Sequence, residues 1–377
     1  MKIAIRLMSC ALSLATGMSA QAAAREWIPQ NDSEVIEQLP ERIRPPAASP
    51  DAAAEAARRW ITLARRTADP RYLGRAQAAL ARWWDRPDAP AALAVLQATV
   101  QQSRHEFDAA RGTLKAALLR EPGQAQGWLT MATLERLSGR YQDAAEACGQ
   151  VRQAGAALYA AACSLETRSL TGNFEPARLG YEALLRQTGD ASTRAWLLSL
   201  LAESEERAGR DASAKAAYQS SLGIDSDGYT ALAYADFLLR LSQPAEALKV
   251  LADQATSDSV LIRQGKALRA QGDIRWKTIN AELAERFAAL DARGEDRALH
   301  ARERALAALW LDDTPGDAWR YAEANLGLQK EPLDWWLAFS AAQAAGRSQD
   351  IDRLRLALKA TGLKDARLAR WQAAQKS

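Results

Sequence analysis

The sequence is poor in the residues that usually carry catalysis and metal binding. Only two histidines and three cysteines occur among its 377 residues, and His105 and His300 lie 195 positions apart. No His-Glu-x-x-His motif, Cys-x-x-Cys motif or glycine-rich phosphate loop occurs, and no serine has the context of a nucleophile elbow. The sequence therefore predicts a protein that is not an enzyme and has neither a metal nor a cofactor. His105 is interpreted as a turn residue that faces solvent.

An excess of charge of one sign is also missing. The whole chain carries a formal net charge of +3, and two of its basic residues, Lys2 and Arg6, lie in the expected leader described below. Without that leader, 47 basic residues face 46 acidic ones. A balanced surface gives no reason to expect nucleic acid or anionic lipid as a partner.

Residues 1–24 have the features of a secretory signal peptide. Lys2 and Arg6 precede an apolar stretch from Leu7 to Met18, and Ala20-Gln21-Ala22 forms a cleavage site of the A-x-A type. Two alternatives stay open: an uncleaved N-terminal helix, and lipidation at Cys10. No later apolar run reaches about 18 residues, so no transmembrane segment is expected. We therefore expect a periplasmic or secreted protein.

The rest of the chain is dominated by helix signals. Residues 25–50 contain five prolines and are predicted to be an extended surface segment. From Asp51, a predicted helix N-cap, turn signals recur every 12 to 18 residues in an alanine-rich chain. No segment shows the sustained alternation of a strand. The sequence predicts an all-α fold over residues 51–377.

A repeat of about 34 residues organises this region. Alanines recur at intervals of 34, 33, 37 and 33 residues: Ala110, Ala144, Ala177, Ala214 and Ala247. Glycine stands five positions before three of them, whereas His105 and Ser242 take that place in the other two. Small side chains let two antiparallel helices approach closely, and a glycine ends a helix by adopting the left-handed conformation. The pattern predicts pairs of helices that share one spacing.

One unit resembles a known family. After Pro122 it carries Trp128, Met131-Ala132, Gly139-Arg140-Tyr141, Ala144 and Cys148. This is similar to the tetratricopeptide pattern W-x2-L-G followed by G-x-Y-x2-A-x3-F. The resemblance implies helix-turn-helix repeats in a right-handed superhelical solenoid with a concave binding face. A generic α-solenoid and a compact helical bundle are the alternatives for the fold.

The resemblance varies along the chain. It is clearest over residues 91–255, weaker at 51–90 and 296–377, and interrupted at 256–295, where a helix from Trp276 to Ala292 exceeds the repeat length. We expect the solenoid to bend or loosen there. Trp128 and Trp336 fall at the large-residue position of a first helix and are predicted to be core residues.

The family resemblance also places the candidate binding residues. In such solenoids the first helix of every repeat lines the groove. Aligning the units puts ten residues near it: Gln126, Thr133, Arg136, Tyr159, Glu166, Trp196, Glu203, Tyr229, Asp236 and Arg240. We expect a protein-binding scaffold or assembly factor of the bacterial cell envelope with a protein or peptide partner. The alternative is a periplasmic accessory protein that binds a glycan or a small ligand for an export system.

The two cysteines that would follow the leader are candidates for a disulfide. Cys148 and Cys163 flank a turn marked by Gly155, at similar heights on two adjacent antiparallel helices. An oxidising compartment favours their pairing. Two separate buried thiols are the alternative, because spacing fixes the height of each cysteine but not its direction.

Overall fold

The computed structural model describes residues 49–294 and 296–372. These residues belong to one compact unit, Pro45–Ser377. The expected signal peptide (1–24), Cys10 and residues 25–48 of the proline-rich segment lie outside the described residues, so the expectations about them stay predictions.

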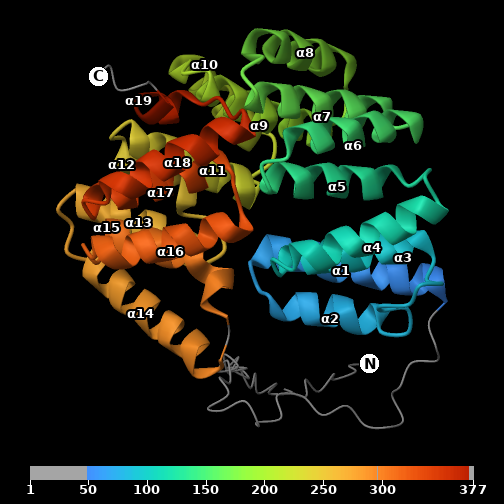
Figure 1. The fold of residues 1–377 in the computed structure, drawn as a ribbon, viewed down its shortest axis with the longest axis horizontal. Coiled ribbons are helices and arrows are strands. Elements are labelled where there is room, and N and C mark those ends of the chain that lie inside the picture. The colour runs from blue at the N-terminus through green and yellow to red at the C-terminus, as the bar shows by residue number, and fades with distance from the viewer. Residues whose placement is uncertain (1–48, 295, 373–377) are drawn as a thin grey trace, which may run out of the picture. The chain divides into compact units, whose positions relative to one another are not determined.

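The described residues form helices and no strand, which confirms the predicted all-α solenoid. Eighteen helices follow one another in nine pairs (Figure 1). The first helices of the pairs are α1 (Pro50–Thr67), α3 (Ala91–Ser103), α5 (Ala125–Leu137), α7 (Ala157–Leu170), α9 (Ala191–Arg207), α11 (Gly228–Arg240), α13 (Asp258–Ala270), α15 (Ala301–Trp310) and α17 (Pro332–Ala344). The second helices are α2 (Arg71–Leu80), α4 (Phe107–Arg120), α6 (Tyr141–Gln153), α8 (Phe174–Gln187), α10 (Asp211–Leu222), α12 (Pro244–Leu251), α14 (Trp276–Ala292), α16 (Pro315–Leu328) and α18 (Ser348–Thr361). A short helix, α19 (Ala369–Gln372), and two 3₁₀ turns, η2 (Arg297–His300) and η3 (Ala366–Leu368), complete the described chain.

The first helix begins earlier than the sequence indicated. Ser49, not Asp51, is the N-cap of α1, and its hydroxyl accepts a hydrogen bond from the Ala52 N–H at 3.2 Å. Pro50 occupies the first helical position, where its missing N–H costs nothing and its fixed φ suits the helix. The proline therefore starts the helix instead of extending the preceding segment.

The repeated alanines lie where the two helices of a pair cross. All five are fully buried: Ala110, Ala144, Ala177, Ala214 and Ala247. Each lies one turn into a second helix, and the helix pairs α5–α6 and α9–α10 make close contact along their length. A methyl group at this position lets the backbones approach, which is the physical basis of the 34-residue period.

The turns before these alanines share one backbone conformation with or without glycine. Gly139, Gly172 and Gly209 have φ of 72°, 92° and 74°, and His105 and Ser242 have φ of 63° and 57°. His105 is thus a turn residue, but the expectation that it faces solvent is wrong. Its ring is half-buried, and its Nδ1 lies 3.3 Å from Nε2 of Gln329, 224 residues away. The C-terminal part of the chain covers this turn.

The interrupted repeat differs from the others in how its second helix packs. α14 has 17 residues but buries only Leu283. α6, α8, α12 and α16 each pack closely on the first helix that follows, whereas α14 packs along α13 and meets α15 mainly through Arg304, which lies 2.8 Å from Asp291. The stack of first helices nevertheless continues, because α13 contacts both α11 and α15.

The C-terminal part of the chain returns to the ends of earlier first helices. The Lys330 N–H donates a hydrogen bond to the Leu137 carbonyl at 2.7 Å, and the Lys364 N–H donates one to the Leu170 carbonyl at 2.8 Å. These carbonyls belong to the last residues of α5 and α7, which lack partners within their own helices. η3 contacts α9.

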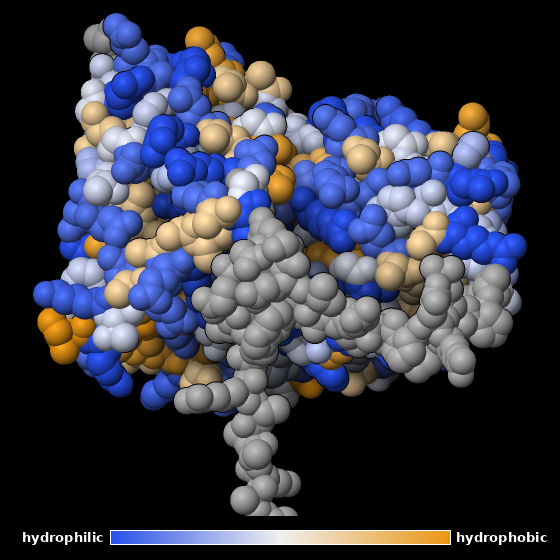
Figure 2. Space-filling model, turned by 90° about the horizontal axis from the view of Figure 1, so that it is seen from below, coloured by the Kyte–Doolittle hydropathy of each residue, from blue (hydrophilic) through white to orange (hydrophobic). Residues whose placement is uncertain are grey.

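The outer surface is polar. The face drawn in Figure 2 is mostly hydrophilic, with small separate hydrophobic areas. The large apolar side chains that are most exposed, Leu119, Ile274 and Leu356, come from three different parts of the described chain. No helix among the described residues has the length and apolarity needed to cross a membrane.

Candidate functional site

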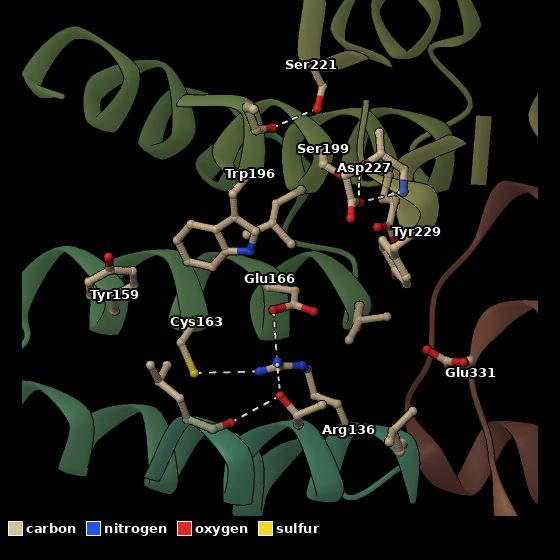
Figure 3. Close-up of a pocket in the computed structure, with 18 of the residues that line it drawn as sticks. Arg136, Tyr159, Cys163, Glu166, Trp196, Ser199, Ser221, Asp227, Tyr229 and Glu331 are labelled. Carbon is tan, nitrogen blue, oxygen red and sulfur yellow. Dashed lines mark hydrogen bonds and ion pairs between the residues drawn. The ribbon is translucent and has the colours of Figure 1, made fainter. Parts of the chain in front are cut away.

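The inner faces of four consecutive first helices enclose a cavity. It has a volume of about 800 Å³ and is lined mainly by α5, α7, α9 and α11, with Glu331 and Pro332 on the side of the C-terminal chain. Figure 3 shows Arg136, Tyr159, Glu166 and Trp196 on these helices, with Glu331 on the neighbouring C-terminal chain. The cavity is large enough to hold several side chains of a partner.

Eight of the ten predicted groove residues line this cavity. They are Gln126, Thr133, Arg136, Tyr159, Glu166, Trp196, Glu203 and Tyr229. The lining residues recur at helical spacing, as Tyr159, Cys163, Glu166 and Leu170 do along α7. Spacings of three and four residues place side chains on one face of a helix. Alignment of the repeats was therefore sufficient to place these residues on the inner face.

The other two predicted groove residues, Asp236 and Arg240, lie outside the cavity. Asp236 Oδ2 lies 2.6 Å from Nη2 of the buried Arg263 on α13. Arg240 Nη2 lies 2.6 Å from Asp211 Oδ1, and its Nε lies 3.3 Å from Glu206 Oε1. Both residues stand near the end of α11 and fasten it to neighbouring helices, and the repeat alignment carries no information about these partners.

Two ion pairs lie in the lining of the cavity. Arg136 Nη2 lies 2.9 Å from Glu166 Oε2 and thereby links α5 to α7. Arg207 Nη1 lies 3.4 Å from Glu203 Oε2 on the same helix, and Arg207 Nη2 donates a hydrogen bond to Ser169 Oγ at 2.8 Å. Arg207 is almost fully buried. A buried guanidinium requires such partners, because desolvation of an unpaired charge is costly.

Glu203 is the carboxyl whose titration is most altered by this environment. Burial raises its pKa, the charge of Arg207 lowers it and the charge of Glu166 raises it, and together these effects give a pKa of about 7. Tyr229 also lies close enough to lower the pKa of this carboxyl. A carboxyl whose pKa lies near neutrality inside a cavity is typical of a functional site.

Aromatic side chains form the accessible wall of the cavity. The rings of Tyr159 and Trp196 have centroids 5.6 Å apart and are tilted by 39°. Tyr159 is 44% exposed and Tyr229 is 59% exposed, although both line the cavity. Their faces are available to a ligand, since Tyr and Trp rings bind apolar, sugar and cationic groups.

Three polar atoms in the cavity lining have no hydrogen-bond partner. They are the Tyr141 hydroxyl, Glu203 Oε1 and Arg207 Nε. Tyr141 is 5% exposed and Arg207 is 3% exposed. Buried polar atoms are normally satisfied, so an unsatisfied group in a cavity lining invites a ligand or water. Among residues 49–294 and 296–372, no group of three or more metal-ligating side chains is placed to hold a metal ion.

Sequence reasoning missed part of the lining. Arg207 lies four residues after Glu203, so helical spacing alone could have found it. Glu331 and Pro332 could not be found in this way, because the contact of their segment with the end of α5 joins residues almost 200 positions apart. A network of charges holds that segment: Arg302 Nη2 lies 2.5 Å from Glu331 Oε2, and Arg302 Nε lies 2.7 Å from Oδ1 of the buried Asp334.

The disulfide candidate borders the same cavity. Cys148 on α6 and Cys163 on α7 are bonded in the structure, with their Cα atoms 5.6 Å apart. Cys163 lines the cavity and its Sγ lies 3.6 Å from Nη1 of Arg136. The bond therefore joins two helices at the wall on which Arg136 and Glu166 lie.

The helix pairs, the left-handed turns and the buried alanines together define the repeat. The described chain is an all-α solenoid whose helix pairs resemble tetratricopeptide repeats. No protein-family model matches the sequence, and no curated protein matches it.

Among the solved structures that are similar to this solenoid are three with 14–15% sequence identity. A tetratricopeptide repeat protein from Parabacteroides merdae has 15% identity and a TM-score of 0.41, with 61% of this chain and 93% of that chain covered. PilF of Pseudomonas aeruginosa has 14% identity and a TM-score of 0.32, with 64% and 96% covered. The tetratricopeptide domain of P58(IPK) has 15% identity and a TM-score of 0.25, with 86% and 96% covered. These superpositions are partial, so the assignment of the fold depends on the helix pairs described above.

Proposed function

We infer that this protein is a non-enzymatic scaffold of the bacterial cell envelope that binds a segment of a partner protein in the cavity. The observation that carries the proposal is the cavity of about 800 Å³, whose wall holds the exposed rings of Tyr159 and Tyr229. Exposed aromatic side chains in a concave site are the usual anchors of a partner. The envelope location depends on the expected signal peptide at residues 1–24.

Site-specific photocrosslinking tests the proposed function. A photoreactive phenylalanine analogue replaces Tyr229 in the cavity or, as a control, Leu119, which is 87% exposed on α4 and does not line the cavity. Irradiation of intact cells should give a discrete crosslinked product from position 229 and none from position 119. Trp196→Ala in the same chain should remove the product. Equal products from both positions would contradict binding in the cavity.

A second candidate function is the binding of a glycan for an export system. The tilted pair Tyr159 and Trp196 favours it, because sugar rings stack on such aromatic faces. Native mass spectrometry with envelope oligosaccharides separates the two functions. An oligosaccharide adduct that is lost in Tyr159→Ala, together with the absence of a protein crosslink, would favour the glycan.

A further inference from the structure

We propose that the cavity recognises a positively charged side chain, best an arginine, presented by a peptide segment of the partner. This inference rests on the proposed function and names the chemistry of the partner. It is drawn from the charges that surround the cavity, the unpartnered atoms in its lining and the position of the aromatic rings.

Carboxylates outnumber basic groups in the cavity. Five acidic side chains line it, against three arginines. The acidic residues are Glu166, Glu203, Asp225, Asp227 and Glu331. The arginines are Arg65, Arg136 and Arg207. A concave site with an excess of one charge attracts the opposite charge.

The charges behind the lining do not cancel this excess. Arg302 is shared by Glu331 and Asp334, so one arginine serves two carboxylates. Arg367 Nη2 lies 2.6 Å from Asp365 Oδ2 and its Nη1 lies 3.5 Å from Glu206 Oε1, and Glu206 also pairs with Arg240, so this second cluster is balanced. The Arg302 cluster adds negative charge on the side of the C-terminal chain.

The unpartnered atoms show where a cation would bind. Among the residues that the structure describes, Glu203 Oε1 and the buried Tyr141 hydroxyl have no hydrogen-bond partner, and Arg207 Nε in the same lining lacks an acceptor, which a backbone carbonyl of a bound peptide can supply. Both oxygens can accept from an N–H donor. A guanidinium carries five donors in a planar fork and no acceptor, so it can satisfy a carboxylate and a hydroxyl together.

The aromatic wall suits the same group. Tyr159 and Trp196 lie on α7 and α9, the helices that carry Glu166 and Glu203, and Tyr229 lies on α11 (Figure 3). A guanidinium stacks on an aromatic face and binds a carboxylate at its edge. A partner carboxylate would instead meet the five acidic side chains, and a neutral donor could satisfy Glu203 Oε1 but would lack the charge that the carboxylates attract.

Peptide libraries with one fixed position test this inference. Three fluorescein-labelled heptapeptide libraries carry arginine, citrulline or glutamate at the central position and random residues elsewhere. Citrulline keeps the shape of arginine without its charge. Fluorescence anisotropy on the mature protein should give an apparent Kd for the arginine library about tenfold below that of the citrulline library. The glutamate library should bind most weakly.

Three variants connect the preference to the cavity. Glu203→Gln should remove the difference between arginine and citrulline, and Glu331→Gln, on the C-terminal segment that lines the cavity, should reduce it. Glu282→Gln is the matched control, because Glu282 also precedes an arginine by four residues but lies on α14, outside the cavity. Circular dichroism verifies that each variant is folded.

The possible outcomes separate this inference from the proposed function. Equal binding of the arginine and citrulline libraries, with both lost in Trp196→Ala, overturns the charge preference and leaves partner binding in place. An arginine preference that persists in both Glu203→Gln and Glu331→Gln also overturns it. Failure of all three libraries to bind, or binding unaffected by Trp196→Ala, overturns both proposals.

Discussion

Helices α9 and α14 carry the same local arrangement of charge, a glutamate followed four residues later by an arginine. In α9 the Glu203 and Arg207 side chains are 22% and 3% exposed. In α14 the Glu282 and Arg286 side chains are 44% and 39% exposed, with Arg286 Nη2 lying 2.8 Å from Glu282 Oε1. α9 packs among α7, α8, α10 and α11, whereas α14 packs along α13 and otherwise meets α15 through the side chain of Arg304.

The comparison shows that packing, and not the local pattern, decides what such a pair does. The buried pair lines a cavity and contains a carboxyl whose pKa is raised to about 7. The exposed pair is a surface ion pair of the kind that contributes about 0.3–0.5 kcal/mol. Packing on both sides of a helix is thus the condition that turns a common charge pattern into a site.

The largest effect should come from removing the disulfide between α6 and α7, in the well-packed region of the described chain. Cys148→Ala with Cys163→Ala removes a bond that closes a loop of 15 residues between α6 and α7. We expect a loss of about 2–4 kcal/mol in the free energy of unfolding, measured by urea denaturation. Intact-mass analysis of the exported wild-type protein, alkylated without reductant, should show no adduct. Two adducts would contradict the bond.

The second effect tests the crossing points of the helix pairs. Ala144→Leu places a larger side chain at a fully buried crossing and should lower the free energy of unfolding by about 1–3 kcal/mol. Lys277→Leu is the control, because Lys277 stands at the aligned position five residues after Gly272 but is exposed. Its effect should stay within about 0.5 kcal/mol. Equal losses in the two variants would abolish the distinction between the two regions.

The fold was largely predictable because local sequence features determine it. Period, turn conformation and the small residue at the helix crossing all lie within one repeat, and neighbouring repeats contact one another in order. The bounds of α14, Trp276 and Ala292, were likewise predicted from the sequence. The two adjacent tryptophans of α17 were not fully readable: Trp335 is 2% exposed and Trp336 is only partly buried, although Trp336 was expected in the core. Adjacent residues on a helix point in directions about 100° apart, and aligning the repeats is not precise enough to tell which of the two tryptophans faces the core.

The site was predictable only on its helical side. Tyr159, Glu166 and Trp196 follow from the face of a first helix, which repeat spacing defines. Glu331 follows from the return of the C-terminal chain to the ends of α5 and α7, and no local pattern encodes that contact. The cover of His105 by Gln329 was missed for the same reason.

The third effect concerns this return of the C-terminal chain. Gly172 and Gly272 both have positive φ, 92° and 71°, but an added Cβ would lie 3.0 Å from Lys364 Cγ only at Gly172. Alanine at either position should cost about 1–2 kcal/mol for the left-handed conformation. Gly172→Ala should in addition speed hydrogen exchange of the Lys364 amide, which donates to the Leu170 carbonyl. Unchanged exchange in Gly172→Ala would show that the contact tolerates the methyl group.

The fourth effect is a pH dependence of stability that we expect from Glu203 on α9 and not from Glu282 on α14. The folded-state pKa of Glu203, about 7, lies above its usual value of 4.5, so its contribution to stability is full below pH 4.5 and is lost as the pH rises to 7. Glu203→Gln removes this dependence. The stability of the variant relative to wild type should therefore rise on the order of 1 kcal/mol between pH 5 and pH 7.5. Arg207, Glu166, Tyr229 and Glu331 surround this carboxyl and stay unchanged in the variant. A difference that falls with pH would contradict the raised pKa.

The smallest effect is expected from the exposed pair on α14. Glu282→Gln removes its ion pair with Arg286, but both side chains stay hydrated and Arg286 keeps Asp258 as a second partner at 3.3 Å. The loss in the free energy of unfolding should therefore be about 0.5 kcal/mol or less at 0.1 M salt, and it should shrink further at 1 M salt because exposed charges are screened. Urea denaturation of the wild type and of Glu282→Gln at the two salt concentrations measures this loss. A loss in Glu282→Gln as large as that in Ala144→Leu would mean that α14 packs against a further surface. Packing could then no longer explain the contrast between α9 and α14, which would have to be attributed to their sequences.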